Sequence, residues 1–355
     1  MSSLFTPLAL RAVTLPNRIA LAPMCQYSAG PDGLPTDWHL VHLGARAVGG
    51  AALVMTEATA VVPEGRISPQ DTGLWSGRHV DAWRPVTRFL AAHGAVPAVQ
   101  LAHAGFKAST YRPWDPRRGG VPDGAGGWTP VGPGGEPFLP DYRVPTALDP
   151  AGITGVVEAF GAAAERAVAA GFAAVEIHSA HGYLLHEFLS PLTNHRVDGW
   201  GGDRAGRMRL TLEVARAVRA AVGEDVPVLT RISATDWVDG GWTVDDSVAL
   251  AVELSAAGVD LVDCSSGGAS PTARIPLARG YQVPLAAQVR REARIPTGAV
   301  GLIVEPEQAE AIVADGEADL VLLGRELLRN PYWPQQAAAK LGVDANWPDQ
   351  YLRAG

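Results

Sequence analysis

The sequence predicts an α/β fold, a (β/α)8 TIM barrel, on two observations: strand-like and helix-like segments alternate along the chain, and no glycine-rich nucleotide motif follows a strand. Runs rich in apolar and β-branched residues predict eight strands, at residues 18–21, 52–56, 96–101, 173–177, 228–232, 261–264, 297–300 and 320–323. Eight right-handed strand–helix units close most naturally into a barrel. An open doubly wound sheet is the alternative, but the chain has neither GxGxxG after a strand nor GxxxxGK followed by Ser or Thr.

Helical periodicity fills the intervals between these strands. It is found at residues 37–48, 80–93, 150–170, 207–222, 244–257, 283–292 and 306–314, and a last helix is expected to begin near Glu326. Glycine follows several of these segments, at Gly94, Gly171, Gly223, Gly258 and Gly316. Glycine in that position favours a left-handed turn that ends the helix before the next strand.

The connection at residues 104–148 is much longer than the others. It is crowded with Gly and Pro, contains Trp114 and Trp128, and has little helical or strand periodicity. A loop of this length in a compact domain is usually a lid or a binding loop. We therefore expect a single domain over residues 1–355, in which 104–148 covers the C-terminal face of the barrel and 345–355 forms a C-terminal tail.

Composition favours a globular enzyme that acts on small molecules. Hydrophobic residues make up 47% of the chain and charged residues 19%, and the formal net charge is -8 with no basic run, so neither nucleic acid nor an anionic membrane is an expected partner. The sequence contains no membrane-length apolar run and no signal-peptide pattern at its start, which predicts a cytoplasmic protein. Cys25 and Cys264 have no CxxC spacing, so we expect free thiols and no metal or cluster.

Chemically capable residues gather at the ends of the predicted strands, where the active site of a barrel forms. Ser265, Ser266 and Gly267 follow the sixth strand, and Gly298, Gly301, Gly324 and Arg325 follow the seventh and eighth. Bare glycine amides and one guanidinium can surround a phosphate group. The sequence therefore predicts a phosphate-bearing cofactor at this position.

The fourth strand ends in the most informative group, His178, His181 and Tyr183. Two imidazoles can donate hydrogen bonds to one carbonyl oxygen, while a phenol close by can protonate a neighbouring carbon. A metal-binding pair and two surface histidines on a loop are the alternatives at this stage.

Four blocks of sequence, in this order, resemble the Old Yellow Enzyme family of FMN-dependent ene-reductases. They are residues 15–27 (LPNRIALAPMCQY), 100–105 (QLAHAG), 178–191 (HSAHGYLLHEFLSP) and 324–331 (GRELLRNP). The resemblance extends over essentially the whole chain. Cys25, followed two residues later by Tyr27, resembles the pattern of the thermophilic-like subgroup. The yeast and plant branch usually has Thr at the position of Cys25.

The resemblance implies non-covalent FMN at the barrel mouth. Carried over position by position, the cofactor-binding residues are Ala22, Pro23, Met24, Cys25, Ala58, Gln100, Arg231, Gly301, Gly324 and Arg325. Arg231 is expected at the pyrimidine edge of the flavin, where a fixed cation stabilises the negative charge of the reduced ring. Gly324 and Arg325 are expected to hold the phosphate.

The same resemblance implies the activity: NADPH or NADH reduces the flavin, and an α,β-unsaturated carbonyl compound is then reduced. His178 and His181 bind the carbonyl oxygen and Tyr183 protonates the α-carbon, while Tyr27 lines the substrate pocket. Members of the family also bind para-substituted phenols, with a charge-transfer band. His39, His42 and His186 have no comparable place, and His39 and His42 are expected to be structural.

Some positions depart from the family pattern. The subgroup often has Arg where this chain has Phe106, and the loop at 104–148 is longer than in the shorter members. The familiar GGSxxNR segment reads GGDRAGR at residues 201–207, so Asp203 takes the place of Ser as the expected helix N-cap. Substrate range and the choice between NADPH and NADH therefore stay open.

The C-terminal tail is also similar to the thermophilic-like subgroup, in which a Tyr and an Arg two residues later reach the neighbouring subunit. Tyr351 and Arg353 have that spacing, so Arg353 is an expected substrate-binding residue of the partner site in a homodimer or dimer of dimers. A solvent-exposed, disordered tail is the alternative.

Three other functions compete with an ene-reductase. A metal-dependent barrel lyase or hydrolase would use His178, His181 and Glu187, but no third ligand stands at a matching strand end. A non-catalytic flavin-binding protein is the second. A relative acting on dienoyl-CoA or amines is the third, but such relatives carry extra domains and an iron–sulfur cysteine motif that this sequence lacks.

Overall fold

A closed barrel of eight parallel strands forms the centre of the computed structural model, which describes residues 2–345 and 347–353. Around the barrel the strand order is β10-β11-β12-β3-β4-β5-β8-β9. The strands are β3 (Ile19–Leu21), β4 (Leu53–Ala60), β5 (Val96–Ala102), β8 (Ala174–Ser179), β9 (Val228–Ser233), β10 (Leu261–Ser265), β11 (Thr297–Ala299) and β12 (Leu320–Leu323). The predicted (β/α)8 barrel is confirmed.

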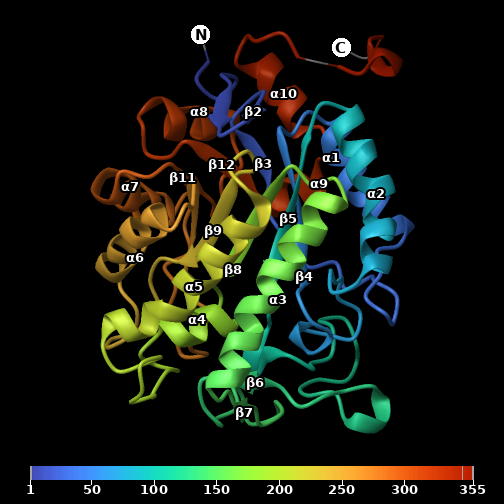
Figure 1. The fold of residues 1–355 in the computed structure, drawn as a ribbon. Coiled ribbons are helices and arrows are strands. Elements are labelled where there is room, and N and C mark those ends of the chain that lie inside the picture. Colours follow the sequence, from blue (N-terminus) through green and yellow to red (C-terminus); the bar gives the residue numbers. More distant parts are fainter. Residues whose placement is uncertain (1, 346, 354–355) are drawn as a thin grey trace.

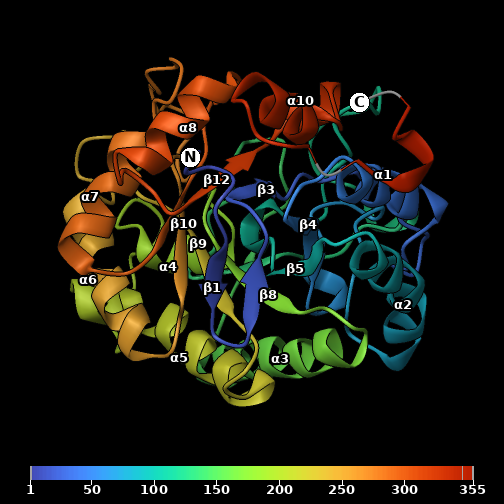
Figure 2. The same ribbon diagram turned by 90° about the horizontal axis from the view of Figure 1, so that it is seen from above.

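Helices surround the barrel and follow the strands in the expected alternation (Figures 1 and 2). They are α1 (Asp37–Val48), α2 (Gly77–Ala92), α3 (Pro150–Ala169), α5 (Arg204–Val222), α6 (Val244–Ala256), α7 (Val283–Ala293) and α8 (Pro306–Ala314). Asp203 caps α5 as predicted, because its carboxylate accepts the backbone N–H of Gly206 at 2.8 Å. The expected left-handed helix stops are also present, since all five glycines named above have positive φ.

Several short elements are present that the sequence did not predict. The β1 (Leu8–Leu10) and β2 (Val13–Leu15) hairpin lies over the N-terminal end of the barrel, where Leu10 and Leu15 pack against the interior side chains (Figure 2). The helix expected from Glu326 is two helices, α9 (Arg325–Arg329) and α10 (Trp333–Lys340). Pro331 lies between them and cannot continue the helix. A short helix, α4 (Leu184–Leu189), follows the turn after β8.

The barrel interior changes from apolar to polar along the strands. Near the N-terminal ends it is filled by Ala98, Ala174, Leu229, Leu261 and other apolar side chains. Side chains two residues further along a strand point to the same side. The next interior layer therefore consists of polar side chains, namely Gln100, Glu176, Arg231 and Asp263, all of them buried. The candidate site is built on this layer.

The long loop after β5 covers the C-terminal face of the barrel, at the bottom of Figure 1. Its regular structure is limited to η2 (Gly105–Lys107), η3 (Asp123–Ala125), and the two-residue strands β6 (Val131–Gly132) and β7 (Thr146–Ala147), which pair in parallel. Residues 110–113, 118–119, 138–139 and 141–142 of this loop line a cavity of about 610 Å³ together with Tyr27 and Tyr183. The expected lid is present.

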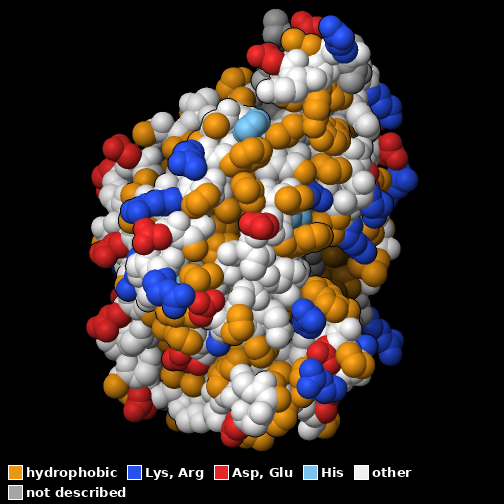
Figure 3. Space-filling model, turned by 90° about the vertical axis from the view of Figure 1, so that its right-hand side faces the viewer, with side chains coloured by type: hydrophobic (Ala, Val, Ile, Leu, Met, Phe, Trp, Pro, Cys, Tyr) orange, Lys and Arg blue, Asp and Glu red, His pale blue; other side chains and the backbone are white. Residues whose placement is uncertain are grey.

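The described part of the tail lies at the other end of the barrel. A short η4 helix (Asp349–Tyr351) places the Tyr351 ring 6.1 Å from that of Tyr332, and residues 347–350 line a cavity of about 510 Å³ with Pro16 and Asn17, which precede β3. Figure 1 shows the chain end at the top, away from the lid, and the space-filling view of Figure 3 keeps the same vertical direction. Asn346, Ala354 and Gly355 lie outside the described residues. No described helix has the length and apolarity to cross a membrane.

Candidate active site

The three residues at the end of β8 come together, as the sequence predicts. The ring of His178 lies between its two partners, with its centroid 5.2 Å from that of His181 and 5.0 Å from that of Tyr183, and both contacts are edge to face. Nε2 of His181 lies 2.7 Å from Oγ of Ser265, while Nδ1 of His178 has no hydrogen-bond partner among the described residues. One small polar group can therefore contact all three side chains.

Their protonation states follow from burial. Burial lowers the pKa of His178 and His181 well below the ordinary value, and the positive charge of Arg231 lowers both further. Each imidazole is therefore neutral at neutral pH and carries one N–H. Burial also raises the pKa of Tyr183 well above its ordinary value, so Tyr183 keeps its phenolic proton. The group can donate hydrogen bonds without adding a net charge.

Arg231 stands beside His178, in the same interior layer as two buried carboxyl groups. Strand register pairs Arg231 with His178 on one side and Asp263 on the other, and Nε of Arg231 lies 3.1 Å from Oδ2 of Asp263. Gln100 donates a hydrogen bond of 2.8 Å to Glu176. Burial raises the pKa of Glu176 to about 8, and the charge of Asp263 adds to this effect, although Arg231 and Gln100 oppose it. Burial likewise raises the pKa of Asp263 to about 6.

The segment after β3 is fixed by a contact that the sequence analysis did not identify. The Glu57 carboxylate accepts the backbone N–H of Gln26 at 2.6 Å and lies 2.9 Å from Nε2 of His39. Nδ1 of His39 in turn accepts the N–H of Thr36 at 2.8 Å. His39 is thus structural, as expected, because it contacts the Glu57 carboxylate that accepts the backbone N–H of Gln26. A charged side chain inside β4, whose other residues are all uncharged and buried, was the available signal.

Tyr27 and Cys25 lie on this segment. Tyr27 lines the same cavity as Tyr183, and Cys25 packs against the same small apolar cluster as these two tyrosines. The ring of Tyr27 is 5.6 Å from that of Trp114, a lid residue, in an edge-to-face contact. Burial raises the pKa of Cys25 well above its ordinary value, and the opposing effect of the neighbouring Tyr27 side chain is smaller. Cys25 is therefore a thiol at neutral pH. Burial also raises the pKa of Tyr27.

Lys107 joins the lid to the turn after β8, and the sequence analysis did not single it out. Its Nζ donates to the carbonyl oxygens of His181 at 2.8 Å and Gly268 at 2.6 Å, and lies 3.9 Å from the ring centroid of Phe138. Burial lowers the pKa of Lys107 to about 8. The only sequence signal was its position shortly after β5, just beyond a block that carries the family resemblance.

Of the residues expected near the phosphate, Gly301 and Gly324 line a cavity of about 240 Å³ between β10, β11 and β12, whereas Gly298 lies within β11 and does not line it. Gly301 has a φ of 122°, and a Cβ there would lie 2.9 Å from Nε2 of Gln282, so only glycine leaves the space open. A Cβ on Gly324 would meet Sδ of Met24 at 3.5 Å, which brings the segment after β3 to the same place. Arg325 also lines the cavity. Open glycine backbone beside a guanidinium fits the phosphate of FMN.

Arg353 and Glu187 lie outside the group at the end of β8. Arg353 is exposed and belongs to the tail at the opposite end of the barrel, so the structure does not bring it to the site of its own chain. Glu187 faces the lid, where Oε1 accepts the N–H of Phe106 at 3.0 Å. Within residues 2–345 and 347–353, no group of three His, Cys, Asp or Glu side chains is arranged to hold a metal.

The chain is similar in sequence to known proteins along almost its whole length. A sequence model of the family described as "NADH:flavin oxidoreductase / NADH oxidase family" matches residues 3–344. The NADPH dehydrogenase of Bacillus cytotoxicus is 44% identical over 354 residues, which are 99% of this chain and 97% of the relative.

Two solved structures are also similar. The old yellow enzyme homologue from Zymomonas mobilis has 28% identity and a TM-score of 0.79 over 97% of this chain and 94% of its own. Morphinone reductase in complex with tetrahydroNAD has 30% identity and a TM-score of 0.77 over 98% and 92%.

The buried carboxyl pair predicts a pH dependence of stability. The pKa of Glu176 is raised in the folded state, so the folded protein keeps a proton that the unfolded chain releases as the pH rises from about 4.5. The folded protein therefore loses stability as the pH rises, and this loss is complete above about pH 8. Glu176→Gln removes the effect and keeps an acceptor for Gln100.

We expect the free energy of unfolding of Glu176→Gln, relative to that of the wild type, to rise by roughly 2–4 kcal/mol as the pH increases from 5 to 9. Urea unfolding of both proteins across that range measures the difference. A constant difference at all pH values would mean that Glu176 is ionised in the folded protein throughout.

Proposed function

This chain belongs to the NADH:flavin oxidoreductase / NADH oxidase family, which includes the Old Yellow Enzymes, and we propose that it reduces the activated C=C bond of α,β-unsaturated carbonyl compounds. It is an oxidoreductase with FMN as its cofactor and a nicotinamide as its hydride donor. The observation that carries the proposal is the convergence of two neutral imidazoles and a protonated phenol at the end of β8.

We propose that FMN is bound across the C-terminal ends of the strands. Gly301, Gly324 and Arg325 would hold its phosphate, Arg231 would stand by its pyrimidine edge, and the remaining contacts would come from Ala22, Pro23, Met24, Cys25, Ala58 and Gln100. Bound FMN supplies a two-electron carrier between the nicotinamide and the substrate. The chain supplies the binding contacts, a fixed positive charge and the proton.

His178 and His181 would bind the carbonyl oxygen of the substrate. Each has one N–H because burial keeps the imidazole neutral. Two hydrogen bonds to that oxygen withdraw electron density from the conjugated alkene and stabilise the negative charge that develops on the oxygen. His181 lies 2.7 Å from the hydroxyl of Ser265, which fixes the orientation of its ring. The same two donors would bind a phenolate oxygen.

Tyr183 would complete the reaction by protonating the α-carbon. The reduction adds a hydride equivalent to the β-carbon and a proton to the α-carbon, so one proton donor must face the substrate. Tyr183 lies beside His178 and retains its proton. The Lys107 ammonium, 5.8 Å from the Tyr183 ring centroid, stabilises negative charge on the phenolate after transfer.

The two histidines can be tested by ligand binding. We expect the double variant His178→Ala, His181→Ala to keep its FMN and lose the charge-transfer band with 4-hydroxybenzaldehyde, because the phenolate oxygen occupies the position of the carbonyl. Spectral titration measures this, and His195→Ala, which removes an exposed imidazole, is the matched control. Loss of FMN with unchanged phenol binding to the remaining holoenzyme would mean that the pair contacts the cofactor instead.

We also propose that the chain forms a single FMN-binding domain and acts as a homodimer or dimer of dimers in which Arg353 reaches the partner's site. Arg353 is exposed, and the described tail lies at the end of the barrel opposite the lid of its own chain. A guanidinium from a neighbouring copy would add positive charge beside the substrate.

Subunit mixing tests this exchange. A heterodimer of Arg353→Ala with an inactive His178→Ala, Tyr183→Phe subunit contains one site with intact catalytic residues and an intact partner arginine. We expect the mixture to exceed the summed activity of its two parents. Activity equal to that sum, together with unchanged oligomeric state after truncation at Pro348, would contradict the shared site.

A further inference from the structure

The turn that carries His181 and Tyr183 has an unusual backbone. His181 has a φ of 60° and Gly182 a φ of 71°, so two consecutive residues are left-handed, and the first of them has a side chain. A Cβ on Gly182 would overlap the carbonyl oxygen of Gly268. A conformation of this kind persists only where its surroundings hold it. The contacts that hold this turn therefore help to determine the geometry of the site.

The backbone amides of this turn have defined acceptors. The N–H of His181 donates to Oγ of Ser233 at 2.9 Å, and the N–H of Gly182 donates to Nδ1 of His186 at 2.8 Å. His186 belongs to α4 and is completely buried. No role for His186 was expected from the sequence, but His186 accepts the backbone N–H of Gly182, which lies between the two catalytic positions.

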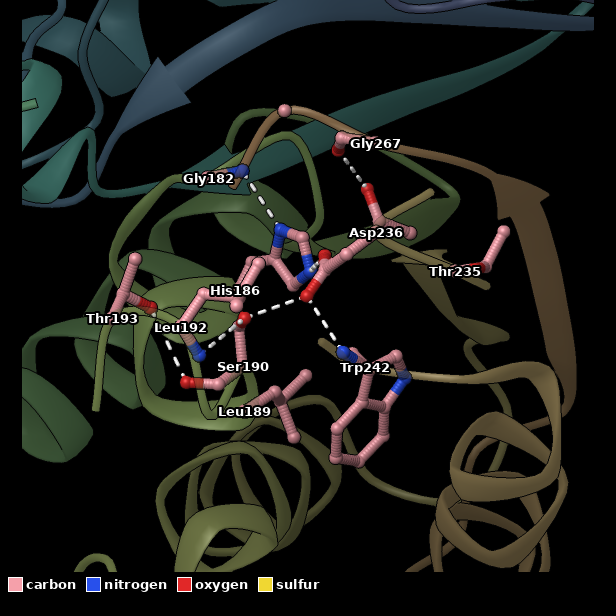
Figure 4. A network of polar contacts seen from close by, with 12 residues as sticks. Gly182, His186, Leu189, Ser190, Leu192, Thr193, Thr235, Asp236, Trp242 and Gly267 are labelled. Atoms are coloured by element: carbon pink, nitrogen blue, oxygen red, sulfur yellow. Dashed lines mark hydrogen bonds and ion pairs between the residues drawn. The ribbon is translucent and has the colours of Figure 1, made fainter. Parts of the chain in front are cut away.

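This hydrogen bond determines the tautomer of His186. Nδ1 accepts an N–H, so it carries no hydrogen, and the hydrogen of the neutral ring is on Nε2. Nε2 lies 3.0 Å from Oδ1 of Asp236, which is also completely buried (Figure 4). A carboxylate facing Nε2 favours this tautomer over the other, in which Nδ1 would point a hydrogen at the Gly182 amide.

Asp236 is itself held in place. Its Oδ2 accepts hydrogen bonds from Oγ of Ser190 at 2.6 Å and from the backbone N–H of Trp242 at 2.7 Å. Burial raises the pKa of Asp236, but His186, Ser190 and the Trp242 amide together outweigh burial and lower it, so the carboxylate is charged. The indole of Trp242 donates to Ser247 of α6 at 2.7 Å. The network thus connects the turn to the scaffold of the barrel (Figure 4).

We propose that His186 and Asp236 are positioning residues: Asp236 selects the tautomer of His186 that accepts the Gly182 amide, and this contact sets His181 and Tyr183 against the substrate. The inference rests on the proposed function of that turn. Neither residue contacts the substrate. A wrong tautomer would replace an acceptor by a hydrogen beside the Gly182 N–H and displace the turn, and a displacement of about 1 Å is enough to slow a reaction by about 100-fold.

Two substitutions of His186 separate its two nitrogens. The amide oxygen of Asn lies near the position of Nδ1, so His186→Asn keeps an acceptor for Gly182. The amide of Gln reaches the position of Nε2, so His186→Gln keeps the contact with Asp236 and leaves the Gly182 N–H without an acceptor. Both variants remove the imidazole, and a role limited to packing would not rank them in this order.

We expect His186→Gln to weaken 4-hydroxybenzaldehyde binding and to slow reoxidation of the reduced enzyme by 2-cyclohexenone by about 10- to 100-fold, with FMN content unchanged. His186→Asn should stay within about three-fold of the wild type. Spectral titration and stopped-flow absorbance measure the two effects on the holoenzyme. Equal losses in both variants, or wild-type behaviour of folded His186→Gln, would overturn the proposal.

Asp236→Asn tests the tautomer directly and keeps every heavy atom in place. The new amide N–H faces Nε2 of His186 and drives the hydrogen onto Nδ1. We expect a loss similar to that of His186→Gln. The double variant Asp236→Asn, His186→Asn should recover substantially, because the side-chain oxygen introduced by His186→Asn accepts the Gly182 N–H without help from Asp236. No recovery would overturn the tautomer argument.

The double variant of His178 and His181 distinguishes failure of this inference from failure of the proposed function. If that variant loses phenol binding while the His186 and Asp236 variants do not, only the positioning role is wrong. If it too binds phenol and reacts with the enone like the wild type, the proposed function is wrong.

Discussion

The parallel register of β8, β9 and β10 is the constraint on which the site depends. It pairs His178 with Arg231 and Arg231 with Asp263, and it pairs Ser233 with Ser265 one layer further along. Side chains alternate between the two faces of a strand, so these residues share the interior only in this register. A shift of one residue in β9 would turn Arg231 toward the helices. The apolar layer beneath, with Leu229 and Leu261, fixes the register because it must stay inside.

The site combines buried charge with buried neutral donors. Arg231 and Asp263 lie at ion-pair distance, and the raised pKa of Glu176 means that this carboxyl is protonated instead of adding a second negative charge. Burying unpaired charge is costly, and a protonated carboxyl avoids that cost. The same burial keeps His178 and His181 neutral. A dry site with fixed donors stabilises developing charge more strongly than water does.

Periodicity and strand-end chemistry predicted the barrel, the long loop over its C-terminal face and the proximity of His178, His181 and Tyr183, because local sequence determines each of these. The roles of the three side chains were expected only from the family resemblance. Contacts between segments distant in sequence were not accessible in this way. Glu57 accepts the backbone N–H of Gln26, Lys107 donates to the carbonyl oxygen of His181, and Asp236 contacts His186. In each pair, the sequence around one partner gives no indication of the other. The β1–β2 hairpin was not predicted because strands of three residues are too short to show a clear alternation of apolar and polar side chains.

The two half-reactions of Tyr183→Phe test the central claim most directly. Stopped-flow absorbance follows reduction of the flavin by NADPH and its reoxidation by 2-cyclohexenone in the same preparation. If Tyr183 is the proton donor for C=C reduction, the enone reoxidises the wild type, and the variant does so about 10- to 100-fold more slowly while its reduction by NADPH is nearly unchanged. A wild type that the enone does not reoxidise, or equal slowing of both steps in the variant, would contradict the account.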